Sequence, residues 1–409
     1  MRPQRQVRTG LALLAVALVG AGCGGARQVV ASSAPASSSA AAAAPTPEVL
    51  TPLLGSVPFA PVPFAGSDGK THLVYELAVT NFTDAKLMIG EVKIVDGRGG
   101  VVGDLDATQL RDRLQPAGSR NGADHLEPGQ AGTIFIHLIL AGDVVPETLV
   151  HQVSVASAAM PPDHNKLTEQ LATTTVDKRT LPVLSAPLRG ERYIAADACC
   201  DAVRHTRAVL PVNGQTFLAQ RYAIDFEQAD AQNRIFTGDA HNPASYSIFG
   251  KEVLAVADGT VVGTRNDLPE QTPGTYPANI PIDQADGNFV VLDIGNGFYV
   301  NYAHMQPGSV RPKLGDTVRR GDVIGLVGNT GNSVAPHLHL HVMDGPSPLA
   351  SQGLPYLYDR FTLTGQVAST ADFDASEGEG IPLVTVPGVQ PAEHVDQLIL
   401  DQNLVTFAP

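Results

Sequence analysis

Three histidines alternate with aliphatic residues in the segment 336–342, whose sequence is PHLHLHV. Successive side chains of a β-strand point to opposite faces, so a strand here places His337, His339 and His341 on one face. Neutral imidazole is a common zinc ligand in proteins. Three imidazoles in register, next to the glycine-containing stretch 328–331, favour a metal site over a solvated polar face of a sheet.

Two further residues could complete such a site. His304 ends the segment 299–304, and Asp225 ends the apolar run 222–225, where a carboxylate has no packing role. A catalytic zinc takes three protein ligands and leaves one position for water. The ion lowers the pKa of that water and polarises a carbonyl group, while neighbouring histidines can move protons. The sequence has no HExxH pattern, which excludes the helical zinc site of thermolysin-like enzymes.

The segments around these residues have the pattern of short β-strands. The chain has 40 glycines, 31 prolines and only 17% charged residues, a composition typical of a turn-rich β protein. Strands are predicted at 72–79, 87–95, 132–140, 151–156, 251–262 (broken at 258–259), 289–294, 298–304, 322–327 and 337–342. We therefore expect a mainly β chain with two folded domains.

The N-terminus has the pattern of an export signal. Three arginines within the first eight residues precede an apolar run, 11–19, that is too short to span a bilayer. We expect a signal peptide over 1–23 that ends at Cys23 in a sequence resembling a lipobox, although glycine replaces the usual aliphatic residue at its first position. The alternative is a plain signal peptide cut nearby. The stretch 24–50 is an Ala/Ser/Pro linker, so we expect an exported, membrane-anchored lipoprotein that faces the cell wall.

The rest of the chain divides into three parts. Residues 51–189 are predicted to form an immunoglobulin-like β-sandwich with no catalytic arrangement, acting as a spacer or as a docking module for a cell-envelope protein. Residues 190–365 form the domain that carries the chemistry. Residues 366–409 are an acidic, loop-like tail until a strand at 398–407.

Charge and cysteine content limit the remaining choices. The formal net charge of −14 excludes nucleic acid as a partner, because phosphate binding needs clustered Lys and Arg. Cys199 and Cys200 are adjacent, and neighbouring cysteines cannot adopt ordinary disulfide geometry without strain. We therefore expect two independent thiols, one buried and one its chance neighbour, although export would make their oxidation possible.

Residues 219–343 resemble the lysostaphin-type (LytM-like) peptidoglycan zinc metalloendopeptidases. The resemblance rests on ordered stretches at 256–262, 287–291, 302–304, 314–318, 321–325, 328–333 and 336–339. It implies a compact antiparallel β-sheet core, similar to a duplicated hybrid motif, with a groove. It also implies hydrolysis of peptide cross-links of peptidoglycan by zinc-activated water.

The resemblance assigns roles to six positions of this sequence. Zinc ligands are implied at Asp225 and His339, and histidines that assist catalysis at His304 and His337. Substrate-groove positions are implied at Asn288 and Tyr302.

Two positions depart from the family pattern. The first zinc-ligand histidine is replaced by Arg221, which is always charged and cannot coordinate zinc. His341 replaces the glutamate that usually follows the paired histidines. The third ligand could be His341, although it lies ~7 Å along a strand from His339. His205 and His241 are the other candidates.

Two functions remain open on the sequence alone. The first is an active zinc endopeptidase, favoured because the aspartate and the three matched histidines are all present. The second is a degenerate, non-catalytic module that binds peptidoglycan or activates another wall hydrolase, favoured by Arg221. A binding module for a different metal is a third, less supported idea.

Overall fold

The computed structural model describes residues 49, 51–142, 144–159 and 165–408. Residues from Thr51 onward form one compact unit. The expected signal peptide (1–23), Cys23 and, apart from Val49, the linker (24–50) lie outside the described residues. Within the described part, no helix is both long enough and apolar enough to cross a membrane.

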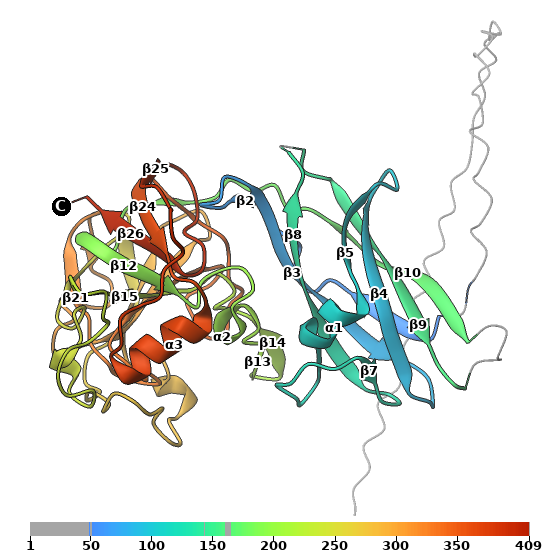
Figure 1. Cartoon of the computed structure of the whole chain (residues 1–409), viewed down its shortest axis with the longest axis horizontal. Coiled ribbons are helices and arrows are strands. Elements are labelled where there is room, and N and C mark those ends of the chain that lie inside the picture. The colour runs from blue at the N-terminus through green and yellow to red at the C-terminus, as the bar shows by residue number, and fades with distance from the viewer. Residues whose placement is uncertain (1–48, 50, 143, 160–164, 409) are drawn as a thin grey trace, which may run out of the picture. The chain divides into compact units, whose positions relative to one another are not determined.

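The first part of the unit is built from two antiparallel sheets (Figure 1). One sheet has the strand order β1-β3-β8-β6, with β2 paired to β3. The other has the order β10-β9-β4-β5, with β7 paired to β4. The elements are β1 (Leu53–Ser56), β2 (Phe64–Ala65), β3 (Thr71–Asn81), β4 (Leu87–Asp96), β5 (Val101–Leu105), α1 (Ala107–Arg113), β6 (Leu114–Pro116), β7 (His125–Leu126), β8 (Ala131–Leu140), β9 (Thr148–Ala156) and β10 (Lys166–Thr175). The expected strands at 72–79, 87–95, 132–140 and 151–156 are confirmed as β3, β4, β8 and β9.

Strand β3 is buried on both faces, so none of its residues is fully exposed to solvent. Leu73, Tyr75 and Leu77 point into the core between the two sheets. Val74, on the opposite face, belongs to the core of the following domain. A strand with two buried faces has a nearly continuous apolar sequence. The two sheets form a sandwich, and its immunoglobulin-like character stays a prediction.

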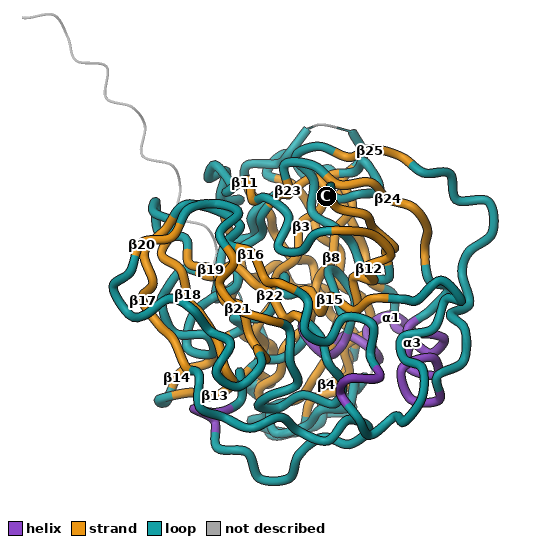
Figure 2. The backbone as a smooth tube through the Cα atoms, turned by 90° about the vertical axis from the view of Figure 1, so that its left-hand side faces the viewer, coloured by secondary structure: helices purple, strands orange, loops and turns teal. Residues whose placement is uncertain are grey.

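The second part is organised around a long, mainly antiparallel sheet with the order β20-β17-β18-β19-β22-β15-β12-β26-β24-β25 among the described residues. Its strands are β12 (Gly190–Ala196), β15 (Ile224–Gln228), β17 (Gly259–Arg265), β18 (Asn288–Asp293), β19 (Tyr299–Met305), β20 (Thr317–Val318), β22 (Leu338–Met343), β24 (Phe361–Gln366), β25 (Ala392–His394) and β26 (Asn403–Phe407). Smaller pairs are β11 (Val183–Leu184) with β23 (Leu357–Tyr358), β13 (Leu210–Val212) with β14 (Gln215–Phe217), and β16 (Glu252–Leu254) with β21 (Val323–Leu326). The mainly β fold class is therefore confirmed, and Figure 2 shows strands and loops predominating.

Short helices supplement this sheet. They are α2 (Val203–Thr206), α3 (Thr370–Glu379) and the 3-10 turns Pro243–Ser245 and Ile282–Gln284. Helix α3 corrects the expectation of a loop, because only Phe373 and Ser376 of its residues are buried, which leaves no helical repeat of apolar residues in the sequence. Its ends have clear signals: the Ser369 side chain accepts a hydrogen bond from the Asp372 amide, and Gly380 ends it in the left-handed conformation.

Strand register brings the chemistry-bearing residues together. Asp225 on β15 lies directly opposite His339 on β22. His339 is also opposite Ala303 on β19, and Asp225 is opposite Ala196 at the end of β12. Two segments therefore lie next to Asp225 and His339: the segment that follows β12, and the end of β19.

Arg221 joins the sandwich to the second domain through a buried ion pair. Its Nε and Nη2 donate to the two carboxylate oxygens of Glu76 on β3, at 2.8 and 2.6 Å, and its Nη1 donates to the carbonyl of Gly353 at 2.7 Å. Arg221 is only 2% exposed and Glu76 is 6% exposed. Two-pronged pairing of this kind satisfies the donors of a buried guanidinium.

We expect Glu76→Ala to lower the free energy of unfolding by roughly 3–5 kcal/mol, because it leaves the Arg221 charge buried without a partner. Denaturant unfolding monitored by circular dichroism measures this change. The double variant Glu76→Leu with Arg221→Met removes both charges and should lose far less stability. Equal losses in the two variants would contradict a role for pairing.

Glu169 on β10 should make folding less favourable as pH rises. Burial raises the pKa of its carboxyl to about 7, although the Leu53 amide donates to it. Between about pH 4.5 and about pH 7 the folded chain therefore holds a proton that the unfolded chain has released, so the free energy of unfolding falls with pH. Glu169→Gln should remove this part of the slope in denaturation curves recorded across that interval. If the pH dependence of the free energy of unfolding were the same in Glu169→Gln and wild type, the proton would not be held by Glu169.

Candidate metal centre

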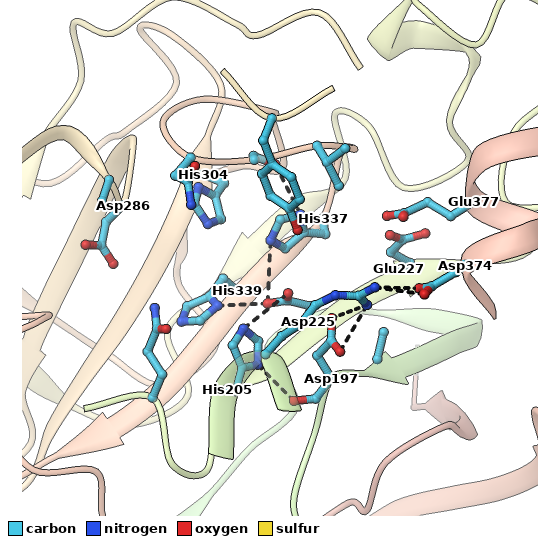
Figure 3. A pocket seen from close by; sticks show the side chains of 18 of the residues that line it. Asp197, His205, Asp225, Glu227, Asp286, His304, His337, His339, Asp374 and Glu377 are labelled. Atoms are coloured by element: carbon cyan, nitrogen blue, oxygen red, sulfur yellow. Dashed lines mark hydrogen bonds and ion pairs between the residues drawn. The ribbon is translucent and has the colours of Figure 1, made fainter. Parts of the chain in front are cut away.

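A cavity of about 510 Å³ opens over the ends of β12, β15, β19 and β22. Figure 3 shows imidazoles and carboxylates facing one another across it. The lining includes the four residues Asp225, His304, His337 and His339, as expected from the sequence. The convergence on which the metal-site hypothesis depends is therefore present.

The Asp225 carboxylate is the centre of this arrangement. One of its oxygens, Oδ1, lies 2.8 Å from His339 Nδ1 and 3.5 Å from His337 Nε2. The other, Oδ2, lies 3.4 Å from His205 Nε2. One acidic group thus faces three imidazoles within a single cavity (Figure 3).

His205 comes from α2, in the segment that follows β12. Its Nδ1 lies 2.9 Å from the carbonyl oxygen of Asp197, which can only accept a hydrogen bond. The proton of a neutral His205 is therefore on Nδ1, and the lone pair of Nε2 faces Asp225. A hydrogen bond that fixes the tautomer in this way is typical of metal-binding histidines.

His205, Asp225 and His339 could together hold a metal ion. Their donor atoms all lie within 4.8 Å of one another. Two imidazoles and one carboxylate are a donor set that suits catalytic zinc, which needs three protein ligands. A second group, formed by His304, His337 and His339, is equally compact but has no carboxylate.

His341 lies behind His339 and not in the cavity. Its Nδ1 is 2.9 Å from His339 Nε2, and its side chain is fully buried. With Nε2 of His339 engaged in this contact, Nδ1 is the atom directed at Asp225. The structure therefore favours His205 over His341 as the third ligand, and gives His341 a supporting contact to His339. The remaining candidate, His241, contacts the Pro273 carbonyl and does not line the cavity.

The two other histidines are held with one ring nitrogen free. His304 Nδ1 lies 2.7 Å from the Thr330 carbonyl, and His337 Nδ1 lies 2.8 Å from the Ala335 carbonyl. Both rings therefore present Nε2 as the unprotonated atom when neutral. The backbone of His304 has φ of 61°, a conformation that non-glycine residues seldom adopt and that is concentrated at functional sites.

The electrostatics of the cavity favour the neutral form of His304 and His339 and the ionised form of Asp225. Burial lowers the pKa of His304 and His339, and like-charge repulsion from neighbouring histidines lowers both further. Burial alone raises the pKa of Asp225, but His205, His337 and His339 outweigh it and hold that pKa well below its usual range. Neutral imidazole and ionised carboxylate are the forms that bind a metal ion.

One wall of the cavity is acidic and was not anticipated from the sequence. Glu227 on β15 faces Glu377 on α3 (Figure 3), and burial followed by mutual repulsion raises the pKa of Glu227 well above its usual range. Arg204 donates to Asp197 and Asp374 at 3.0 and 2.8 Å, which ties α3 to the segment before α2. The acidic residues of α3 do not form a recognisable sequence motif. They can be assigned to the cavity only once the position of α3 in the fold is known.

The two predicted groove residues, Asn288 and Tyr302, do not line the cavity. Both are fully buried. The Asn288 side chain bonds the Leu268 backbone, and the Tyr302 hydroxyl accepts from the Val256 amide at 2.8 Å. Both predictions are corrected: these side chains support the strands and loops behind the site, because their polar atoms are used by the backbone.

Comparison with known proteins gives the relationship of this domain. A family model described as peptidase family M23 matches residues 241–351. These residues belong to peptidase family M23. The matched segment contains His304, His337 and His339. It begins after His205 and Asp225, so these two residues lie outside it.

Relatives of this segment include an endolysin and a peptidoglycan DD-endopeptidase. Endolysin 2638A of Staphylococcus phage 2638A is 39% identical over 80 residues, which are 19% of this chain and 16% of the endolysin. The peptidoglycan DD-endopeptidase ShyA of Vibrio cholerae is 35% identical over 104 residues, 25% of this chain and 20% of ShyA. The chain therefore spans a fifth or less of the length of these relatives.

Solved structures of M23 enzymes are also similar to the domain. The catalytic domain of lysostaphin from Staphylococcus simulans is 22% identical and covers 40% of this chain and 88% of its own, with a TM-score of 0.22. The M23 metalloprotease pseudoalterin from the deep sea is 14% identical and covers 53% and 95%, with a TM-score of 0.26. Because these scores are low, the assignment rests on the family match and the sequence relatives.

We expect His205→Ala to lose the zinc that the wild-type chain retains after dialysis, because only two ligands remain. Mass-spectrometric metal analysis of the purified chain measures this loss. His341→Ala should still bind zinc, with affinity weakened about 10–100-fold through loss of the contact to His339.

His241→Ala is the matched control and should keep its zinc, since this histidine lies outside the cavity. Retention of full zinc content by His205→Ala would show that the third ligand is a different residue.

Proposed function

We propose that this chain is a zinc metalloendopeptidase that hydrolyses peptide cross-links of peptidoglycan. The observation that supports it best is the convergence of His205, Asp225 and His339, with two further histidines, in one cavity of an M23 domain. The two relatives named for endolysin and DD-endopeptidase activity support peptidoglycan as the substrate.

The donor set fits the ion in number, type and charge. Three donors leave one position for water, and the total ligand charge would be −1, because histidine binds a metal ion as neutral imidazole and aspartate as carboxylate. When bound, zinc supplies Lewis-acid polarisation of the scissile carbonyl group and acidifies water. Two contacts behind the donors hold their orientation, one from the Asp197 carbonyl to His205 and one from His341 to His339.

His304 and His337 are placed to manage protons during hydrolysis. Their ring centroids are 4.6 Å apart, and each has its Nδ1 proton held by a backbone carbonyl. Either Nε2 can accept a proton from the attacking water, and the resulting imidazolium can donate to the departing amine. It can equally stabilise negative charge on the carbonyl oxygen.

The alternative of a non-catalytic module loses the observation that favoured it. Arg221 pairs with Glu76 outside the cavity, so its charge does not enter the metal centre. His205, whose donor atom lies within 4.8 Å of those of Asp225 and His339, supports a third ligand in place of the residue at position 221. No second function is therefore proposed.

The site of action follows from the substrate and from the N-terminal sequence. Export by residues 1–23, with lipid on Cys23 and the 24–50 linker as a tether, would place the enzyme in the cell envelope beside its substrate. The sandwich would then act as a spacer or bind an envelope protein.

We expect the zinc-loaded chain to release soluble cross-linked fragments from purified peptidoglycan. His304→Ala should slow this release by about 10²–10⁴-fold and keep its zinc, because it removes proton transfer only. His339→Ala should lose both zinc and activity. Chromatography of digested sacculi, with zinc measured on the same samples, provides the readout.

His241→Ala should digest peptidoglycan at the wild-type rate. Zinc-loaded wild-type protein that binds sacculi and releases no fragments would overturn the hydrolase proposal.

A further inference from the structure

A second group of metal-binding side chains lies where the sandwich meets the M23 domain. His72 is on β3 and His137 is on β8, at paired strands of one sheet. Their ring atoms His72 Nδ1 and His137 Nε2 are 2.9 Å apart. His72 is 1% exposed, so this contact is shielded from water.

Each of these imidazoles has its other nitrogen against a carboxylate. His72 Nε2 lies 2.9 Å from Asp68 Oδ1, and His137 Nδ1 lies 2.9 Å from Asp201 Oδ2. An ionised carboxylate only accepts hydrogen bonds, so it draws the single proton of a neutral imidazole to that nitrogen. The two nitrogens that face each other then both carry lone pairs.

Two facing lone pairs at 2.9 Å repel unless a proton or a metal ion lies between them. Two nitrogens bound to one zinc at 2.0–2.1 Å with tetrahedral geometry are about 3.3 Å apart, so zinc would replace the shared proton if the two rings moved apart by about 0.4 Å. A carboxylate on the far nitrogen of a ligating histidine is also a recurrent feature of zinc sites. In this site both histidines have such a carboxylate, Asp68 for His72 and Asp201 for His137.

A third donor is Cys200, whose sulfur lies within 4.8 Å of a ring nitrogen of each histidine. In the structure Cys200 is joined to Cys199 by a disulfide. The expectation of two independent thiols is therefore wrong, since the backbone brings the neighbouring sulfur atoms together. A disulfide sulfur is a poor ligand, whereas a thiolate binds zinc strongly.

We propose that His72, His137 and Cys200 form a second zinc site, which is completed when the disulfide between Cys199 and Cys200 is reduced. A dithiol supplies two electrons and two protons, breaks the S–S bond, and becomes a disulfide itself. Cys200 then loses its thiol proton to solvent as its thiolate binds zinc. Three protein ligands leave one position for water.

The location gives this site a structural role. His72 and His137 belong to the sandwich, whereas Cys200 and Asp201 precede the His205 helix in the M23 domain. Zinc here would tie the sandwich to the segment that carries His205 and the Asp197 carbonyl. Bound zinc and the Cys199–Cys200 disulfide exclude each other, so the redox state of these cysteines decides whether that tie forms.

Two matched cysteine variants of the full chain test the site. Cys199→Ser leaves Cys200 free without any reductant, whereas Cys200→Ser also abolishes the disulfide and leaves a thiol at the neighbouring position. We expect Cys199→Ser to hold one more zinc per chain than Cys200→Ser. Cobalt(II) should show a thiolate-to-metal absorption band in Cys199→Ser and not in Cys200→Ser. Wild-type protein should gain the extra zinc after reduction by a dithiol and its removal.

Histidine substitutions in the Cys199→Ser chain separate the two sites. His72→Ala should lose the extra zinc and keep the first one, whereas His339→Ala should lose the first and keep the extra one. Because His72 is buried, His137→Ala, at a side chain that is 12% exposed, provides a second test. Both should retain wild-type circular dichroism.

Equal zinc content in the two cysteine variants would overturn the proposal, and the contact between the histidines would then be bridged by a proton alone. Retention of the extra zinc by both histidine variants would overturn it as well. Because zinc is counted directly, either result stands whether or not the chain hydrolyses peptidoglycan.

Discussion

The contacts between one carboxylate and three imidazoles constrain how the elements around the cavity are arranged. Burial raises the pKa of Asp225, whose side chain is 17% exposed, but His205, His337 and His339 approach it from two segments and hold that pKa well below its usual range. Each approach requires its own part of the fold. The β15–β22 register sets His339 opposite Asp225, and the β12–β15 register brings the segment before His205 to the same point. A one-residue slip in either pair would turn a donor to the other face of the sheet.

The position of Arg221 bears on the proposed metal centre. The family resemblance implies a histidine ligand at this position, whereas the Arg221 side chain is directed toward Glu76 and does not line the cavity. In the proposed site the third ligand is His205, whose tautomer is fixed by the Asp197 carbonyl. The sandwich takes part in this arrangement, because it provides the carboxylate that neutralises the arginine.

Sequence reasoning succeeded where one local pattern determined the structure. The alternation in 337–342 predicted a strand with histidines on one face, and β22 confirms it. The meeting of Asp225 with His339 came from the family resemblance, since they are far apart in sequence. His205 could be named only as a candidate, because β12 has no clear alternation and its pairing with β15 is a long-range contact.

Other features had no local signal. The acidic wall of the cavity depends on α3, whose sequence lacks an apolar repeat. The family resemblance implied groove positions at Asn288 and Tyr302, yet their polar atoms are used by the backbone. Burial of a polar side chain is a tertiary property, and neighbouring residues in the sequence do not reveal it.

Strand β3 has a consequence for how this protein can be divided. One face of β3 completes the core of the sandwich, and the other supplies Val74 to the core of the M23 domain and Glu76 to Arg221. A fragment that lacked the sandwich would expose apolar surface and leave the Arg221 guanidinium in its interior without an acidic partner. The sandwich is therefore a structural part of the second domain, and exchanging it for an unrelated binding module would require a new partner for Arg221.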